Sequence, residues 1–72
     1  MTFSIERIDA ISRDVCRLFA EGERVGVVAE LIKARNPTEA ALIAAMASDK
    51  MTPFTRKAFI DFLTLQALSL ST

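Results

Sequence analysis

The sequence predicts an all-α protein, a small bundle of about four short helices that is completed by dimerisation. Apolar residues recur at helical spacing along nearly the whole chain. The chain contains neither tyrosine nor tryptophan and has two glycines, so signals for strands and hairpins are few. Two prolines, each preceded by a small polar residue, mark helix starts in the second half of the sequence. We expect one domain that spans residues 1–72.

The first predicted helix covers residues 5–21. Ser4 is a suitable N-cap, and Phe3 and Ile8 have the spacing of a hydrophobic staple across that cap. Gly22 is the expected stop, because glycine readily adopts the left-handed conformation that follows a helix C-cap. An apolar stripe along this helix consists of Ile5, Ile8, Ile11, Val15, Leu18 and Phe19.

The second predicted helix covers residues 24–35. Its apolar stripe consists of Val25, Val28, Leu31 and Ile32. Gly26 inside a helix costs about 0.5–1 kcal/mol relative to alanine, and the neighbouring valines also tolerate extended backbone. An extended segment over residues 24–28 is therefore the alternative.

Residues 36–39, Asn-Pro-Thr-Glu, predict the start of a third helix over residues 37–48. Asn36 can act as the N-cap, Pro37 suits the first helical position, and Glu39 occupies the N3 position of a capping box. Proline also disfavours a helical conformation for the residue before it, so the second helix must end by Asn36.

Thr52 and Pro53 repeat the cap and the proline, which predicts a fourth helix over residues 53–70. The connections are short, so neighbouring helices should fold back on each other. The third helix is rich in alanine and lets a neighbour approach closely. We expect the fourth helix to fill that space with Phe54, Phe59, Ile60, Phe62, Leu63, Leu65, Leu68 and Leu70.

The fourth helix is apolar around most of its circumference. Such a helix is central in a fold or is covered on several sides, and three thinner helices cannot easily cover it. We therefore predict a homodimer whose interface is built largely by this helix, with some contribution from the first. The candidate interface residues are Phe59, Phe62, Leu63 and Leu65. A monomer that wraps the fourth helix, or a surface kept for a different protein, are the competing interpretations.

Composition restricts the classes of function. A chain of 72 residues buries about 60% of the surface that its unfolded form exposes, so its core gains from a disulfide, a metal or a partner subunit. Cys16 is the single cysteine and histidine is absent, so we expect no intrachain disulfide, metal site or cofactor. Nine basic and nine acidic residues give zero net charge, whereas nucleic-acid-binding proteins usually carry excess positive charge. The free cysteine suits the cytoplasm, and no segment predicts a signal peptide or a membrane span.

Residues that could carry chemistry have simpler structural interpretations. Cys16 lies beside Val15 on the first helix, and without a histidine base we expect a half-buried structural thiol rather than a reactive one. Gly22 and Gly26 flank a turn and a helix start, since the preceding strand and the Gly-Lys-Ser/Thr of a phosphate loop are missing. Two carboxylate pairs are expected at the surface as partners of arginines at i,i+4 spacing: Asp9 with Asp14, and Glu21 with Glu23.

Arg56 and Lys57 form a basic pair in the first turn of the fourth helix, where the helix dipole disfavours cations. They are a solvated surface pair or, alternatively, polar contacts to an acidic partner or a phosphate. The favoured function is a non-enzymatic interaction module, a dimeric adaptor, inhibitor or regulatory protein that acts by protein–protein contact. The alternative is a dimeric DNA-binding transcriptional regulator that uses Arg56 and Lys57 and, in addition, Arg13 and Arg17.

Overall fold

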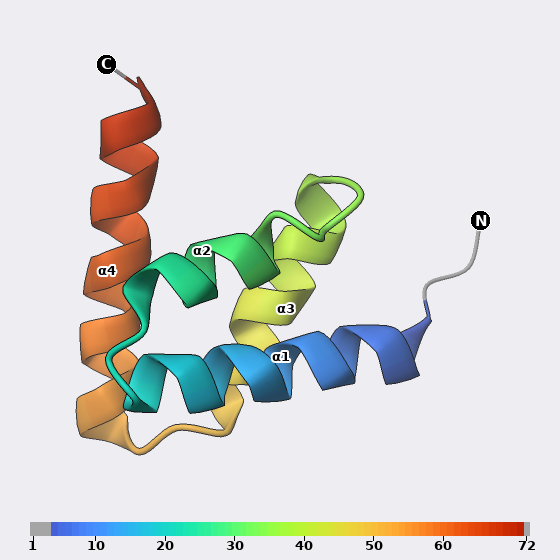
Figure 1. Cartoon of the computed structure of the whole chain (residues 1–72), viewed down its shortest axis with the longest axis horizontal. Helices are drawn as coiled ribbons and strands as arrows, with labels where there is room; N and C mark the ends of the chain where they lie inside the picture. Colours follow the sequence, from blue (N-terminus) through green and yellow to red (C-terminus); the bar gives the residue numbers. More distant parts are fainter. Residues whose placement is uncertain (1–3, 72) are drawn as a thin grey trace.

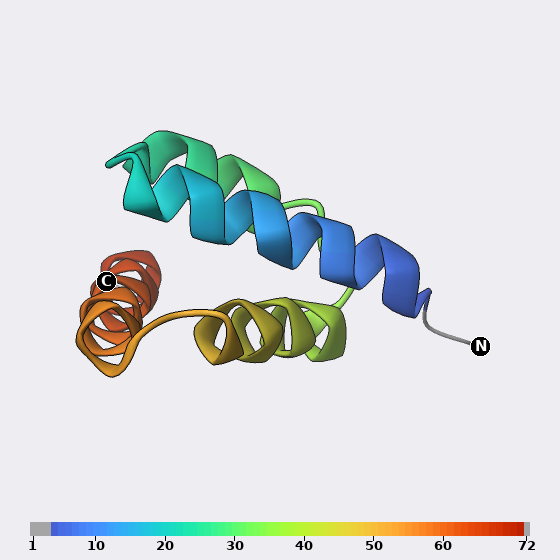
Figure 2. The same ribbon diagram turned by 90° about the horizontal axis from the view of Figure 1, so that it is seen from below.

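The computed structural model describes residues 4–71, with side chains as far as residue 67. Four helices follow one another: α1 (Ile5–Ala20), α2 (Arg24–Leu31), α3 (Pro37–Asp49) and α4 (Pro53–Ser71). No strand occurs in the described range, so the predicted all-α class is confirmed. Helices α1 and α2 form one layer, and α3 and α4 form the other (Figure 1 and Figure 2).

Helix α1 begins and ends as the sequence predicts. Ser4 Oγ accepts a hydrogen bond of 3.3 Å from Arg7 N, which makes Ser4 the N-cap. After the C-cap, Gly22 has a φ of 80°, in the left-handed region that favours glycine. The predicted staple involves Phe3 and lies outside the described residues.

The two prolines begin α3 and α4, as predicted. Asn36 Oδ1 accepts a hydrogen bond of 2.8 Å from Glu39 N at the start of α3. Thr52 Oγ1 accepts one of 3.2 Å from Thr55 N at the start of α4. Short polar caps and the fixed φ of proline are local effects, which explains why the sequence alone locates these helix starts.

Helix α2 is helical from Arg24 onward, so the alternative of an extended segment over residues 24–28 is wrong. The predicted end at Arg35 is also wrong, because the helix ends at Leu31. After Leu31, side chains from other helices bind the backbone. Arg7 Nη2 donates a hydrogen bond to Lys33 O at 2.7 Å. Arg35 N donates to a carboxylate oxygen of α3 at 3.0 Å. These contacts hold residues 32–35 in turns.

The buried face of α2 differs from the predicted stripe. Val27 is fully buried, whereas Val25 is 84% exposed and Ile32 is 73% exposed. Gly26 explains the difference, since a Cβ at this position would lie 3.2 Å from Leu18 Cδ2. The glycine lets α1 and α2 approach closely, and this approach turns Val27 toward the core.

The core is built mainly from α1 and its contacts with the other helices. The buried apolar side chains are Ile8, Ile11, Val15 and Phe19 from α1, Val27 from α2, Ile43 and Ala47 from α3, Met51 from the following turn and Phe59 from α4. The predicted stripe of α1 therefore faces the core along most of its length. Ile5, in the first turn, is an exception and is 59% exposed.

Helix α4 does not fill the space against α3 as predicted. Helix α3 packs chiefly on α1 and makes few contacts with α4, which lies beside the C-terminal end of α3 in the same layer (Figure 2). Phe59 is the fully buried residue among the described side chains of α4, whereas Phe54, Ile60 and Leu65 are exposed. The C-terminal end of α4 extends past the other helices (Figure 1).

Candidate functional site

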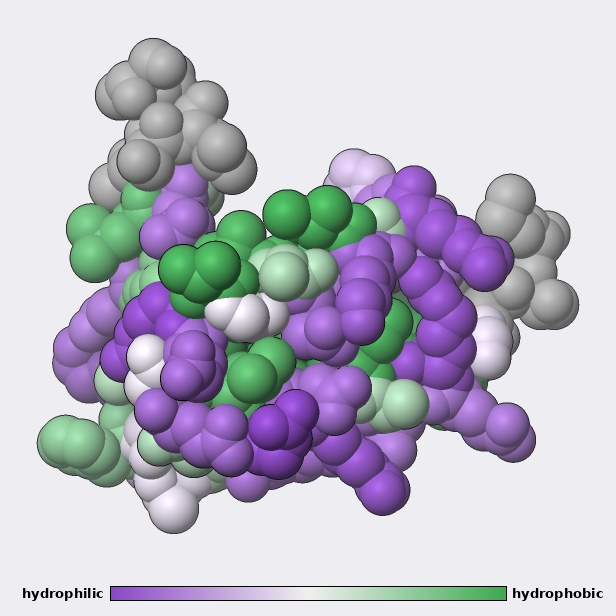
Figure 3. Space-filling model, viewed as in Figure 1, coloured by the Kyte–Doolittle hydropathy of each residue, from purple (hydrophilic) through white to green (hydrophobic). Residues whose placement is uncertain are grey.

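Apolar side chains that face solvent gather on α2 and α4. Val25 and Ile32 project from α2, and Leu65, which is 65% exposed, projects from α4. Phe54 in the first turn of α4 is 87% exposed. In the space-filling view, hydrophobic residues cover α2, whereas the surface over α1 is largely hydrophilic (Figure 3). The candidate site of this chain is therefore a surface on α2 and α4.

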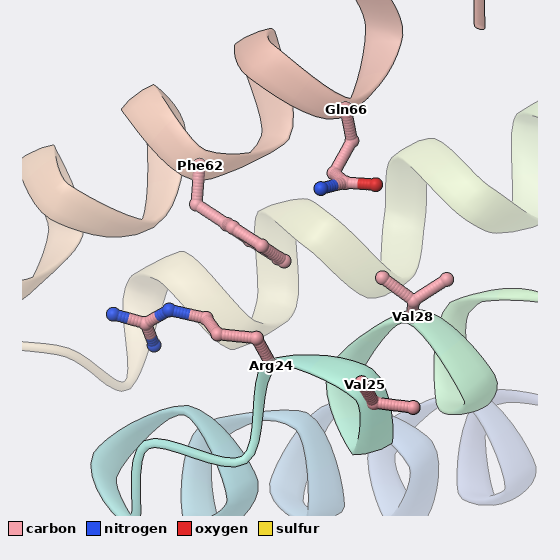
Figure 4. A pocket seen from close by; sticks show the side chains of 5 residues that line it. All are labelled: Arg24, Val25, Val28, Phe62 and Gln66. Atoms are coloured by element: carbon pink, nitrogen blue, oxygen red, sulfur yellow. The ribbon is translucent and has the colours of Figure 1, made fainter. Parts of the chain in front are cut away.

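An open groove of about 240 Å³ lies between these two helices (Figure 4). Val25 and Val28 line it from α2, and Phe62 and Gln66 line it from α4. Arg24 closes the end of the groove next to Phe62. We call this feature the α2–α4 groove. Its walls are apolar apart from one cation and one amide.

Aromatic packing beneath the groove fixes the positions of Arg24 and Phe62. The Phe19 ring meets Phe59 edge-on, with centroids 5.2 Å apart, and lies 6.0 Å from the Phe62 ring. The Arg24 guanidinium carbon lies 4.0 Å from the Phe19 centroid and 5.4 Å from the Phe62 centroid. Arg24 Nη1 also donates to Phe19 O at 3.3 Å. Stacking of this kind stabilises a cation over aromatic faces, so contacts within the single chain hold both groove residues in place.

The four candidate interface residues are not equivalent in the structure. Phe59 is fully buried against Phe19 within the single chain. It is therefore a core residue and is not accessible at the surface. Leu63 is half-buried and packs against the core. Phe62 is half-buried and lines the groove, and Leu65 is exposed. Helical periodicity places all four on an apolar helix, but the crossing of α1 over α4 decides which of them is covered.

Arg56 and Lys57 have separate intramolecular roles. Arg56 Nε donates to Ser48 O at 2.9 Å, and its Nη2 donates to Met51 O at 3.1 Å. The side chain thus caps the C-terminal carbonyls of α3, where the helix dipole favours a cation. Lys57 Nζ pairs with Asp61 Oδ2 at 2.9 Å on the exposed face of α4. The unfavourable position of Arg56 in its own helix is offset by this contact with the preceding one.

The arginines of α1 also have acidic partners. Arg13 Nε lies 2.8 Å from Asp9 Oδ2, at i,i+4 spacing. Arg17 lies 3.4 Å from Glu21 and 3.9 Å from Asp14. These contacts confirm the predicted pairing with arginines for Asp9, Asp14 and Glu21, whereas Glu23, in the exposed turn after α1, is not among these pairs.

Cys16 is a half-buried thiol, as predicted. Its Sγ donates to Ala47 O at 3.1 Å and so links α1 to the last turn of α3. Burial raises the pKa of the Cys16 thiol above its ordinary value, although nearby Lys50 opposes the shift. The thiol is therefore protonated at neutral pH, which disfavours thiolate chemistry.

A buried ion pair that sequence analysis did not identify joins α1 to the start of α3. Arg7 Nη1 lies 2.8 Å from Glu39 Oε1, and the Glu39 side chain is buried. The same oxygen accepts the hydrogen bond from Arg35 N, one residue before the cap at Asn36. Glu39 therefore replaces the expected capping-box bond to Asn36 N with a bond one residue earlier. Hydrogen bonds from Arg7 and then from Arg35 N lower the pKa of Glu39 below its ordinary value.

A second ionic cluster joins α1 to the end of α3. Lys50 Nζ lies 3.0 Å from Asp9 Oδ1 and donates to Ser12 Oγ at 3.1 Å and to Met46 O at 3.3 Å. Ser12 is buried and donates in turn to Asp9 O at 2.7 Å. The hydrogen bond from Lys50 lowers the pKa of Asp9. Lysine at position 50 gives no sequence signal for this role, because Asp9 lies far away along the chain.

Within the described range, no helix is long and apolar enough to span a bilayer. The same residues contain no group of three or more metal-ligating side chains. No protein-family model, curated protein or solved structure matches this chain.

Proposed function

We propose that this chain is a small, non-enzymatic helical interaction module that acts as an adaptor, inhibitor or regulatory protein through protein–protein contact. The observation that carries the proposal is the α2–α4 groove with exposed apolar side chains beside it. A surface that combines an aromatic residue, an arginine and aliphatic walls has the composition of interface hot spots. Phe62 and Arg24 are the anchor residues of this surface.

The size of the groove supports a protein partner over a small molecule. Ligand pockets in proteins usually have volumes of about 300–1,000 Å³ and enclose most of the ligand. The α2–α4 groove has a volume of about 240 Å³ and is open to solvent. It suits one apolar side chain that projects from a partner surface.

The alternative of a DNA-binding regulator has less support. Its candidate phosphate-contacting residues Arg56, Lys57, Arg13 and Arg17 all have partners within the chain. Releasing them to bind phosphate would cost those contacts, and zero net charge provides no long-range attraction to DNA. A gel shift with duplex DNA that weakens steeply with salt would favour this alternative.

A photo-crosslinking amino acid at Val25 tests the proposal in the native host. The matched control carries the same amino acid at Ala45, which is exposed on α3 and distant in sequence from the groove. We expect a protein adduct from position 25 and none from position 45. Crosslinks of equal intensity at both positions, or none at position 25, would contradict a contact surface at the groove.

A further inference from the structure

We infer that the occupant of the α2–α4 groove is a second copy of this chain, whose Leu65 enters the groove and whose Asp61 pairs with Arg24. This inference rests on the proposed function, because it names the partner of the same surface. Two features carry it: an apolar side chain that lies beside its own groove, and opposite charges on the two surfaces that would meet.

Leu65 is an exposed apolar side chain next to the groove. It lies at i+3 spacing from Phe62, which lines the groove from the same helix. A protruding residue adjacent to its matching groove allows two copies to exchange contacts across a two-fold axis, with each Leu65 in the other copy's groove. Contacts of this kind close on themselves, whereas a groove and a protrusion on distant faces would generate a filament.

The charges of the two surfaces also match. Among the five residues that line the groove, Arg24 carries the charge, and its guanidinium makes one hydrogen bond within the described part of the chain. Asp61 lies one helical turn before Leu65 on the same face of α4. Its partner Lys57 is highly exposed, and an exposed pair of this kind contributes little to stability. Asp61 can therefore exchange Lys57 for Arg24 of a second copy at small cost.

The position of Arg24 determines the direction of the second helix. Arg24 lies at the Phe62 end of the groove, and Gln66 lies at the other end (Figure 4). With Leu65 of the second copy in the groove, its Asp61 reaches Arg24 when the two α4 helices run in the same direction. The outer face of α2, with Val25 and Ile32, then extends the contact beyond the groove.

The whole chain is compatible with association of identical copies. Nine basic and nine acidic residues leave no net charge to repel a second copy. A stable interface buries about 800 Å² on each partner, which one groove for one side chain cannot supply. The exposed apolar residues of α2 are therefore part of the inferred interface.

Light scattering coupled to size exclusion tests the inference with single variants. We expect a wild-type dimer at high micromolar concentration and a folded monomer for Leu65→Asp. Ile5→Asp is the matched control, because Ile5 is similarly exposed but lies on α1. The control should remain dimeric. A monomeric wild type, or a dimer that tolerates Leu65→Asp, would overturn the inference.

Charge reversal tests the ionic contact. Arg24→Glu and Asp61→Arg should each weaken dimerisation by at least about tenfold, as expected for loss of a close charge pair. An equimolar mixture of the two variants should form a heterodimer, because both symmetric contacts then regain opposite charges. Circular dichroism checks that each variant is folded. If Arg24→Glu unfolds, Asp61→Arg alone decides, and an unchanged dimer affinity for it counts against the inference.

These results separate the inference from the proposed function. A monomeric protein that still forms a specific adduct with a different protein from position 25 keeps the interaction function and removes the second copy as the occupant. Absence of any adduct at position 25 removes both.

Discussion

Asn36 contributes to stability through one hydrogen bond, the 2.8 Å contact from Glu39 N to its side-chain oxygen. We predict that Asn36→Ala lowers the free energy of unfolding by about 1 kcal/mol, the usual loss for a good N-cap. Asn36→Asp keeps the acceptor and serves as the control. Urea denaturation measures both variants, and an unchanged midpoint for Asn36→Ala would show that this cap contributes nothing.

Arg56 and Lys57 provide a matched pair of adjacent cations with different roles. We predict that Arg56→Ala lowers the free energy of unfolding by about 1.5 kcal/mol, because hydrogen bonds from a charged donor to Ser48 O and Met51 O are lost. Lys57→Ala should change it by less than about 0.5 kcal/mol, since its partner is an exposed carboxylate. Thermal denaturation distinguishes the two variants. Equal effects would mean that Arg56 does not act as a cap.

The roles of Arg56 and Lys57 can be predicted from the sequence only in part. Adjacent cations in the first turn of a helix are recognisable as unusual from the sequence. The carbonyls that Arg56 reaches belong to the preceding helix and its turn, and their position depends on how the chain turns between α3 and α4. Lys57 points away from that turn, although it is the next residue.

At the scale of elements, the contact between α1 and α3 should be acid-sensitive. The folded pKa values of Glu39 and Asp9 lie below their ordinary values of 4.5 and 3.8. A lowered carboxyl pKa contributes stability that is present above the unfolded pKa and is lost as the pH falls through the folded pKa. We predict that the urea midpoint is constant near neutral pH and declines below about pH 5.

Variants assign this acid sensitivity to the ion pair at Glu39. Glu39→Gln removes the charge, so its urea midpoint should start lower and depend less on pH than that of the wild type. Glu23→Gln, in the exposed turn between α1 and α2, is the control. Parallel pH profiles for the wild type and Glu39→Gln would contradict the assignment.

The beginnings of helices were predictable from the sequence, whereas the end and the inner face of α2 were not. Caps and prolines act on neighbouring residues, so Asn36 and Thr52 are readable without a structure. The end of α2 depends on Arg7 and Glu39, which bind the backbone of residues 33 and 35 from other helices. The inner face of α2 depends on the close approach at Gly26.

At the scale of the whole molecule, α4 should open before the rest of the fold. Among its described side chains Phe59 is fully buried, whereas α1 contributes four buried apolar residues. Regions with few buried contacts open locally at lower free energy. We predict that backbone amides in residues 60–67 exchange with deuterium faster than those in the centre of α1. Equal protection of both helices in the monomer would contradict this prediction.

The distribution of apolar residues over the molecule shows what a single sequence can and cannot predict. The excess of apolar side chains on α4 is visible in the sequence, and Phe54 and Leu65 are indeed exposed. Among the apolar residues of α4, Phe59 is buried because its ring packs against Phe19, which lies forty positions earlier in the chain. The α2–α4 groove also depends on how helices distant in the sequence pack together, so no local sequence pattern predicts it.

The end of α3 makes the fold hard to divide into fragments. Its last carbonyls receive donors from three parts of the chain: Cys16 of α1, Lys50 of the turn and Arg56 of α4. A protein shortened after Thr52 would lose Phe59 from the core and would also leave Ser48 O and Met51 O without the Arg56 donor. The loss would unwind the last turn of α3, which carries two contacts to α1. We therefore expect the first three helices not to fold as an independent unit, and we expect a tag or fusion that displaces α4 to loosen the contacts between α1 and the end of α3.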